Sequence, residues 1–186
     1  MKKLQMHSLE SVDHLLQPYE VEEITLSSPA TEVFTDFKET RPLMIDAGTV
    51  AFEAEYEMRR AHVKLKFVVD ESLEMVGVVS YQDLSSERVI KMVAEGLGSE
   101  EMKVTDLMQP RSSLHSLEIM DVENATVGDV IHTLRENGEQ HCLVIDHQLH
   151  HIRGLISASD IARRLHLPVF IEQTPTFASI VNALHH

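Results

Sequence analysis

GLISASD, residues 154–160, repeats a pattern that the chain also carries in GVVSYQD, residues 77–83. Both stretches read glycine, two aliphatic residues, serine, two variable residues and aspartate. A short β-branched run that ends in aspartate precedes each of them, KFVVD at 66–70 and CLVID at 142–146. These runs are typical of buried strands that enter a turn. The duplication predicts that the chain contains one structural unit twice.

A helix is predicted upstream of each strand pair, because apolar residues recur there at helical spacing. In the second unit the stripe consists of Val127, Val130, Ile131 and Leu134, and in the first unit of Val50, Ala54, Met58 and Ala61. Thr126 and Asp129 have the spacing of a capping box, and Asn137-Gly138 predicts the end of that helix. A further helix is predicted after each Ser-x-x-Asp. It carries Leu84, Val89, Ile90 and Val93 in the first unit and ends near Pro168 in the second.

These elements predict a mixed α/β (α+β) fold with two small sheets flanked by helices. Each unit enters through an extended segment, TDLMQP in the second. We expect the units to pack into one pseudo-twofold body, since neither can easily bury its sheet alone at this size. The predicted parts are an N-terminal helical extension at 1–27, repeat 1 at 28–98, repeat 2 at 99–168 and a C-terminal helical extension at 169–186. The expected linker is 96–104.

Both extensions carry a helical stripe. The residues are Leu9, Val12, Leu15 and Leu16 before Pro18, and Phe177, Ile180, Val181 and Leu184 after a capping Thr176. Two interpretations stay open: each helix covers the core of its own chain, or one of them contacts a second subunit.

Composition excludes several classes of function. The formal net charge is −14, from 30 acidic and 16 basic residues. It argues against nucleic-acid binding and against docking on an anionic membrane. No apolar run approaches the roughly 20 residues of a membrane span, and the N-terminus lacks a signal-peptide core, so we expect a cytoplasmic protein. The single cysteine, Cys142, excludes an internal disulfide and is expected to pack in a core strand.

The simplest interpretation of Ser-x-x-Asp is a capping box at the start of a helix. A cap does not need the glycine three residues before each serine, whereas a glycine at a strand end permits close approach by another group, including a ligand. A serine at a helix N-terminus suits a phosphate, and an aspartate one turn later can accept the hydroxyls of a ribose. The repeated motif is therefore also compatible with a nucleotide site.

Here the chain resembles a tandem pair of cystathionine-β-synthase (CBS) domains, a Bateman module. The motifs at 77–83 and 154–160 match that family's glycine, hydrophobic, any, Ser/Thr, any, any, Asp signature. DLMQP at 106–110 resembles the usual start of a second repeat. The resemblance covers about residues 28–168. It implies a homodimer that binds AMP, ADP, ATP or S-adenosylmethionine in clefts between the repeats, with no required cofactor.

By that resemblance, aspartates bind the ribose and serines face the phosphate. The candidate nucleotide-binding residues are Ser80, Asp83, Gly154, Ser157, Ser159 and Asp160, together with Arg153 and Arg163 beside the second motif. The arginines lead us to expect the more highly charged ligand at the second site, although an exposed surface role is an equal alternative. The first repeat departs from the pattern, with His62 in place of the Gly138 of the second.

We therefore expect a non-catalytic sensor that signals to a regulated protein. The alternative is a structural or interaction module with vestigial sites. No catalytic motif appears, so we do not expect an enzyme. His147, His150 and His151 cluster in one turn, but we expect solvated side chains there and no metal site.

Overall fold

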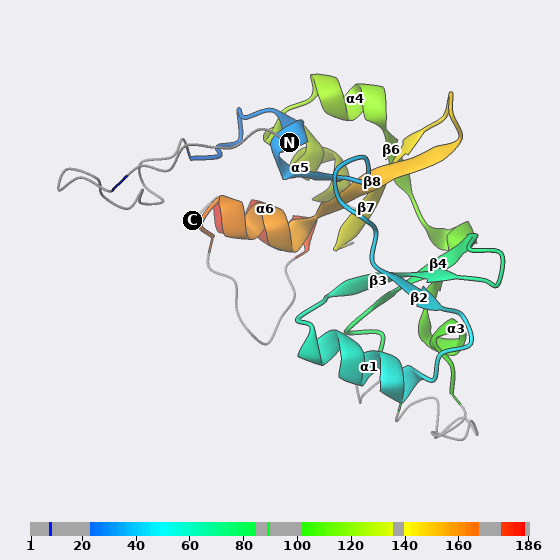
Figure 1. Ribbon diagram of the computed structural model, residues 1–186. Helices are drawn as coiled ribbons and strands as arrows, with labels where there is room; N and C mark the ends of the chain where they lie inside the picture. The colour runs from blue at the N-terminus through cyan, green and yellow to red at the C-terminus, as the bar shows by residue number, and fades with distance from the viewer. Residues whose placement is uncertain are drawn as a thin grey trace.

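The computed structural model describes residues 8, 23–84, 89, 102–135, 140–167 and 176–184. The predicted N-terminal stripe, most of the predicted helix after Asp83 and the predicted stop at Asn137-Gly138 lie outside these residues. Figure 1 shows two lobes, each built from a small sheet with helices against it. None of the helices in the described ranges is long and apolar enough to cross a membrane.

The two sheets share one plan, which confirms the mixed fold with two small sheets. The first sheet has the order β2-β3-β4-β5, with bounds Met44–Asp46, Leu65–Val69, Met75–Ser80 and Gln109–Pro110. The second has the order β6-β7-β8-β1, with bounds Ser116–Glu118, His141–Asp146, His151–Ser157 and Phe34–Asp36. In each sheet an antiparallel hairpin has a parallel strand on one side and an antiparallel strand on the other. The matching strand pairings of the two sheets agree with the duplication seen in the sequence.

In each sheet, the edge strand beside the hairpin comes from the part of the chain that forms the other repeat. β1 precedes the first sheet in sequence but pairs with β8, and β5 follows the linker but pairs with β4. The motif glycines lie at these two junctions, with Gly77 opposite Pro110 and Gly154 opposite Asp36. This exchange ties the sheets together, whereas the repeat boundaries drawn from the sequence stay a prediction.

The exchanged strands also explain why both motifs begin with glycine. A Cβ atom at Gly77 would lie 2.5 Å from the carbonyl oxygen of Gln109, and one at Gly154 would overlap Phe34 and the carbonyl of Thr35. Close approach by backbone is therefore what excludes a side chain at both positions. The expected close approach at these glycines is thus made by the chain itself, and a role of Gly154 in ligand binding stays a prediction.

The helices cover the sheets largely as predicted. α1 is Ala51–Arg60, with Ala54 and Met58 buried, and α5 is Val127–Leu134, with its whole apolar stripe buried. The capping box of Thr126 and Asp129 is confirmed. The shorter helices are α4, Ile119–Asn124, and α6, Ala158–Arg164. Single 3₁₀ turns, η2 and η3, span Ala30–Val33 and Arg111–Ser113.

The predicted linker and the predicted extended conformation of TDLMQP need correction. Met102 is buried, and Val104 begins the helix α3, Val104–Leu107, so the last residues of 96–104 are part of the fold. TDLMQP is accordingly helical at first and extended only at β5. The cause is local, since the Asp106 carboxylate accepts the backbone N–H of Lys103 at 2.8 Å and caps the turn.

Among the residues that the structure describes, three apolar clusters hold the elements together. One lies in each lobe, and a third joins the facing sheets through Phe67 and Val78 of the first and Leu143 of the second. The C-terminal helix α7, Phe177–Leu184, buries Phe177 and Ile180 in the second lobe. This favours the interpretation that α7 covers the core of its own chain. Cys142 is buried in the same cluster, as predicted.

Candidate functional site

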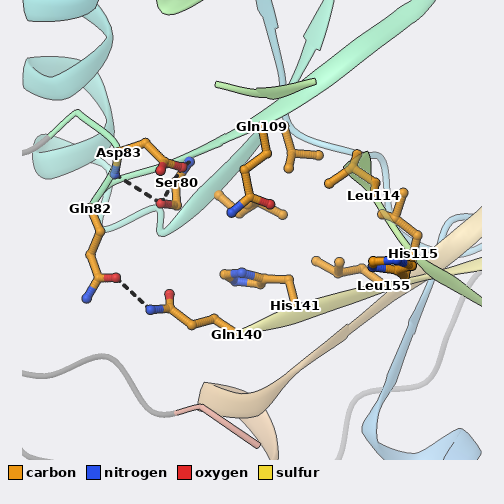
Figure 2. Close-up of a pocket in the computed structure, with 12 residues that line it drawn as sticks. Ser80, Gln82, Asp83, Gln109, Leu114, His115, Gln140, His141 and Leu155 are labelled. Carbon is orange, nitrogen blue, oxygen red and sulfur yellow. Dashed lines mark hydrogen bonds between the residues drawn. The ribbon is translucent and has the colours of Figure 1, made fainter. Parts of the chain in front are cut away.

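A cavity of about 190 Å³ lies between the two lobes, beside the first motif. Strands β3 and β4 supply one wall, and β7 and β8 supply the other. The lining consists of Leu65, Val78, Ser80, Gln82, Asp83, Gln109, Leu114, His115, Gln140, His141, Leu143 and Leu155. Figure 2 shows the polar members directed into the space between the repeats. The cavity thus combines apolar walls with a polar end at the Ser80–Asp83 turn.

The first motif is closed on itself by hydrogen bonds. The Asp83 carboxylate accepts the Ser80 N–H at 2.9 Å and the Ser80 hydroxyl at 2.7 Å, and the Asp83 N–H donates to Ser80 Oγ at 3.1 Å. Asp83 is 7% exposed. This is the capping box that was the simplest interpretation of the sequence. A carboxylate offers about four acceptor positions, so the bonds from Ser80 do not themselves exclude a bond from a ligand.

A hydrogen bond between two glutamines, which sequence reasoning missed, joins the lobes at the cavity. Gln140 donates its amide N–H to the amide oxygen of Gln82 at 2.6 Å, as Figure 2 shows. Next to Gln140, burial lowers the pKa of His141 to about 4, although the charges of Asp160 and Asp83 oppose this. The ring is therefore neutral near pH 7, and it lies within electrostatic reach of both motif aspartates.

The second motif has the same spacing but a different hydrogen-bond pattern. Ser157 is the N-cap of α6 and is buried, yet its side chain makes no capping hydrogen bond. Asp160 instead accepts a hydrogen bond from Arg163 within the first turns of the helix. Neither these residues nor Gly154 and Ser159 line the cavity beside Ser80.

The two arginines that are candidate nucleotide-binding residues beside the second motif both form ion pairs with carboxylates. Arg153 donates to both carboxylate oxygens of Asp36, at 3.0 and 2.5 Å, and so joins β8 to β1. Burial opposes the ionisation of Asp36, but the hydrogen bonds from Arg153 and the Lys38 N–H, together with both positive charges, outweigh it and lower the pKa of that carboxyl. Arg163 is an exposed side chain bound to Asp160. Both arginines thus have carboxylate partners, and neither lines the cavity beside Ser80, so their role at a second site stays a prediction.

The family model described as "CBS domain" matches residues 33–89 and 122–167, which together are more than half of the chain. The chain belongs to the CBS domain family. The two matched segments carry the two motifs, so the pair is a tandem of CBS repeats. No curated protein sequence matches the chain significantly.

Solved structures of CBS proteins share this architecture. A conserved protein from Pyrococcus horikoshii, described as uncharacterized, has 18% identity and a TM-score of 0.57, with 79% of this chain and 98% of that one covered. CBSX2 in complex with AMP has 21% identity and a TM-score of 0.50, with coverage of 73% and 94%. The CBS domain of a bacterial CNNM/CorC family Mg²⁺ transporter in complex with ATP has 17% identity and a TM-score of 0.53, with coverage of 77% and 91%. At these identities the similarity establishes the fold.

The residues that complete the cavity come from outside the CBS motifs. Gln109, Gln140 and His141 lie at strand ends of the opposite repeat or of the exchanged strand. The sequence indicated these residues only indirectly, because Gln140 and His141 directly precede the predicted buried strand CLVID. Their role depends on the packing of one repeat on the other, which no local pattern encodes.

The histidine turn offers no converging donors. His147 forms a hydrogen bond with Glu118. Within the described ranges, no group of three or more His, Cys, Asp and Glu side chains is placed to hold a metal ion.

Proposed function

We propose that this CBS pair is a non-catalytic sensor that binds an adenosine-containing ligand between its repeats and signals to a partner protein. One observation carries the proposal: the cavity is built from both repeats and contains the motif residues Ser80 and Asp83. A ligand held there contacts both lobes at once. Such a ligand shifts the equilibrium between lobe arrangements by its difference in affinity for them.

The known complexes support the class of ligand. CBSX2 was solved with AMP and the transporter CBS domain with ATP, in the same fold as this chain. The expected ligands remain AMP, ADP, ATP and S-adenosylmethionine, with Asp83 accepting the ribose hydroxyls. The apolar side chains of both sheets would enclose the base, because pockets of this kind are mostly apolar with a few fixed polar groups.

Calorimetric titration of the full chain with AMP, ATP and S-adenosylmethionine tests the proposal. Asp83→Asn should abolish the binding of whichever ligand associates. Asp129→Asn is the matched control, because it removes a capping carboxylate of identical geometry in α5, away from the cavity. Equal affinities for wild type and Asp83→Asn would exclude Asp83 from the site.

The second candidate is a structural or interaction module whose sites are vestigial. It is favoured by the closed bonding of Asp83 to Ser80 and of Asp160 to Arg163, which gives both carboxylates an internal role. Thermal unfolding separates the candidates. A ligand at 100 times its dissociation constant stabilises the folded state by about 2.7 kcal/mol, whereas this candidate predicts no shift with any adenosine compound.

A further inference from the structure

The charge of the cavity lining differs from that of a phosphate site. None of its twelve described residues is a lysine or an arginine, and one of them, Asp83, is a carboxylate. Proteins usually hold phosphate with arginine or lysine, or with uncommitted backbone N–H groups. A phosphate moved into this cavity would lose its hydration next to a negative charge, with no lysine or arginine among the described lining residues to compensate.

The local donors of the first motif are already used. The Ser80 N–H and hydroxyl donate to Asp83, and the Asp83 N–H donates to Ser80. A phosphate would have to break this capping box in order to be bound there. The histidine ring at the same end adds no positive charge, because burial lowers the pKa of His141 to about 4.

The neutral polar groups instead suit a base and a sugar. Gln109 carries an amide at the cavity, and an amide side chain can donate to and accept from the edge of an adenine, whereas Gln82 and Gln140 also bond to each other. The volume, about 190 Å³, lies below the roughly 300–1,000 Å³ typical of ligand pockets. A compact ligand fits this space better than one that carries a phosphate chain.

On these grounds we propose that the cavity beside Ser80 selects a purine nucleoside without phosphate over the corresponding nucleotides. The inference rests on the proposed function and narrows its ligand class. Asp83 then has two effects on selectivity, since it accepts the ribose hydroxyls and repels a 5′-phosphate.

The test is calorimetric titration of the full chain with adenosine, AMP and ATP at one ionic strength. Adenosine should bind about tenfold or more tightly than either nucleotide. Asp83→Asn should lose adenosine binding, whereas Asp129→Asn should retain it. AMP or ATP binding as tightly as adenosine overturns this inference but leaves the proposed function in place. Absence of binding by all three compounds and by S-adenosylmethionine overturns both.

A charge-introducing variant gives an independent readout if Asp83→Asn folds poorly. Gln82 is exposed at the edge of the cavity, so Gln82→Arg supplies the missing cation without filling a core position. It should raise AMP affinity about tenfold relative to adenosine. Leu73→Arg, at a hairpin position that is 72% exposed, is the control for total charge and should leave the ratio unchanged. An unchanged ratio in Gln82→Arg contradicts the inference.

Discussion

The two Ser-x-x-Asp motifs have equivalent positions in their sheets but different bonding. Ser80 and Asp83 form a closed capping box at the cavity, whereas Ser157 caps α6 without a side-chain bond and Asp160 pairs with an arginine. The difference follows from context, because only the second motif has Arg163 three residues after its aspartate. Duplication therefore conserved the backbone position of the motif and left its side-chain chemistry free to diverge.

The largest expected effect comes from the motif glycines. Gly154→Ala should lower the free energy of unfolding by about 3 kcal/mol, because the added methyl group overlaps an aromatic ring and a backbone carbonyl. Gly77→Ala should lower it somewhat less, since one of its two close neighbours is the flexible Met108 side chain. Urea denaturation measures both.

Gly48→Ala is the control for the glycine variants. Its nearest neighbour is the side-chain oxygen of exposed Asp46, so the change should stay within about 1 kcal/mol. Losses equal to this control at Gly77 and Gly154 would mean that the exchanged strands tolerate a methyl group, and our explanation of the motif glycine would be wrong.

His141 lies near both motif aspartates, and its titration is the second test. Its pKa is about 4 in the folded state and about 6.5 in the unfolded chain. Between these values the unfolded state binds a proton that the folded state does not, so acid destabilises the fold in this window. The wild type should lose roughly 2 kcal/mol more than His141→Gln between pH 7 and pH 4.5. Parallel stability curves for the two proteins would show that His141 titrates normally.

The exchanged strands are held differently in the two lobes, which gives a third comparison. The Arg153–Asp36 pair is largely buried and joins β1 to β8, so Asp36→Asn should cost about 2 kcal/mol at pH 7. The pKa of Asp36 is lowered in the folded state. The pair's contribution is therefore present above the usual aspartate range and is lost as the pH falls through the lowered value.

Glu57→Gln is the control for the ion pair. Glu57 pairs with Lys66 at 3.0 Å and is 60% exposed, so its loss should cost at most about 1 kcal/mol. Denaturation of both variants at pH 7 and pH 3 tests whether the stability lost through Asp36→Asn becomes smaller at low pH. Equal losses of unfolding free energy for Asp36→Asn and Glu57→Gln at pH 7 would show that the Arg153–Asp36 pair stabilises the fold no more than an exposed ion pair does.

The smallest expected losses of stability are those of the two motif aspartates, and they distinguish the two motifs. Asp83→Asn replaces a buried capping carboxylate by a neutral amide, which is a weaker acceptor, and should cost about 1 kcal/mol. Asp160→Asn removes an exposed pair with Arg163 and should cost about 0.5 kcal/mol or less. Thermal unfolding without ligand gives both values. A larger loss from Asp160→Asn would reverse our assignment of which motif is the structural cap.

Local patterns predicted most of the fold. The stripe in α5, its capping box at Thr126 and the hairpins around KFVVD and CLVID all follow from spacing within a few residues. The strand exchange was not predictable, because β1 and β5 are three and two residues long and pair with strands far away in sequence. The motif glycines were noticed in the sequence, but the reason why glycine is required there depends on the strand exchange.

The site was predictable only in part, for the same reason. Ser80 and Asp83 were found by their repetition, and the cavity does contain them. Gln109, Gln140 and His141 belong to no motif, and their position depends on how one repeat packs on the other. Arg153 was a candidate residue of the second site, and no local pattern predicted its bond to Asp36, which is 117 residues away in sequence.

The central claim is that the cavity between the repeats binds a nucleoside through Asp83. A crystal structure of the full chain grown with equal concentrations of adenosine and AMP tests it most directly. The account predicts adenosine between the two sheets, with its ribose hydroxyls on the Asp83 carboxylate. An empty cavity in which Asp83 bonds only to Ser80, or a nucleotide bound elsewhere on the molecule, would contradict it.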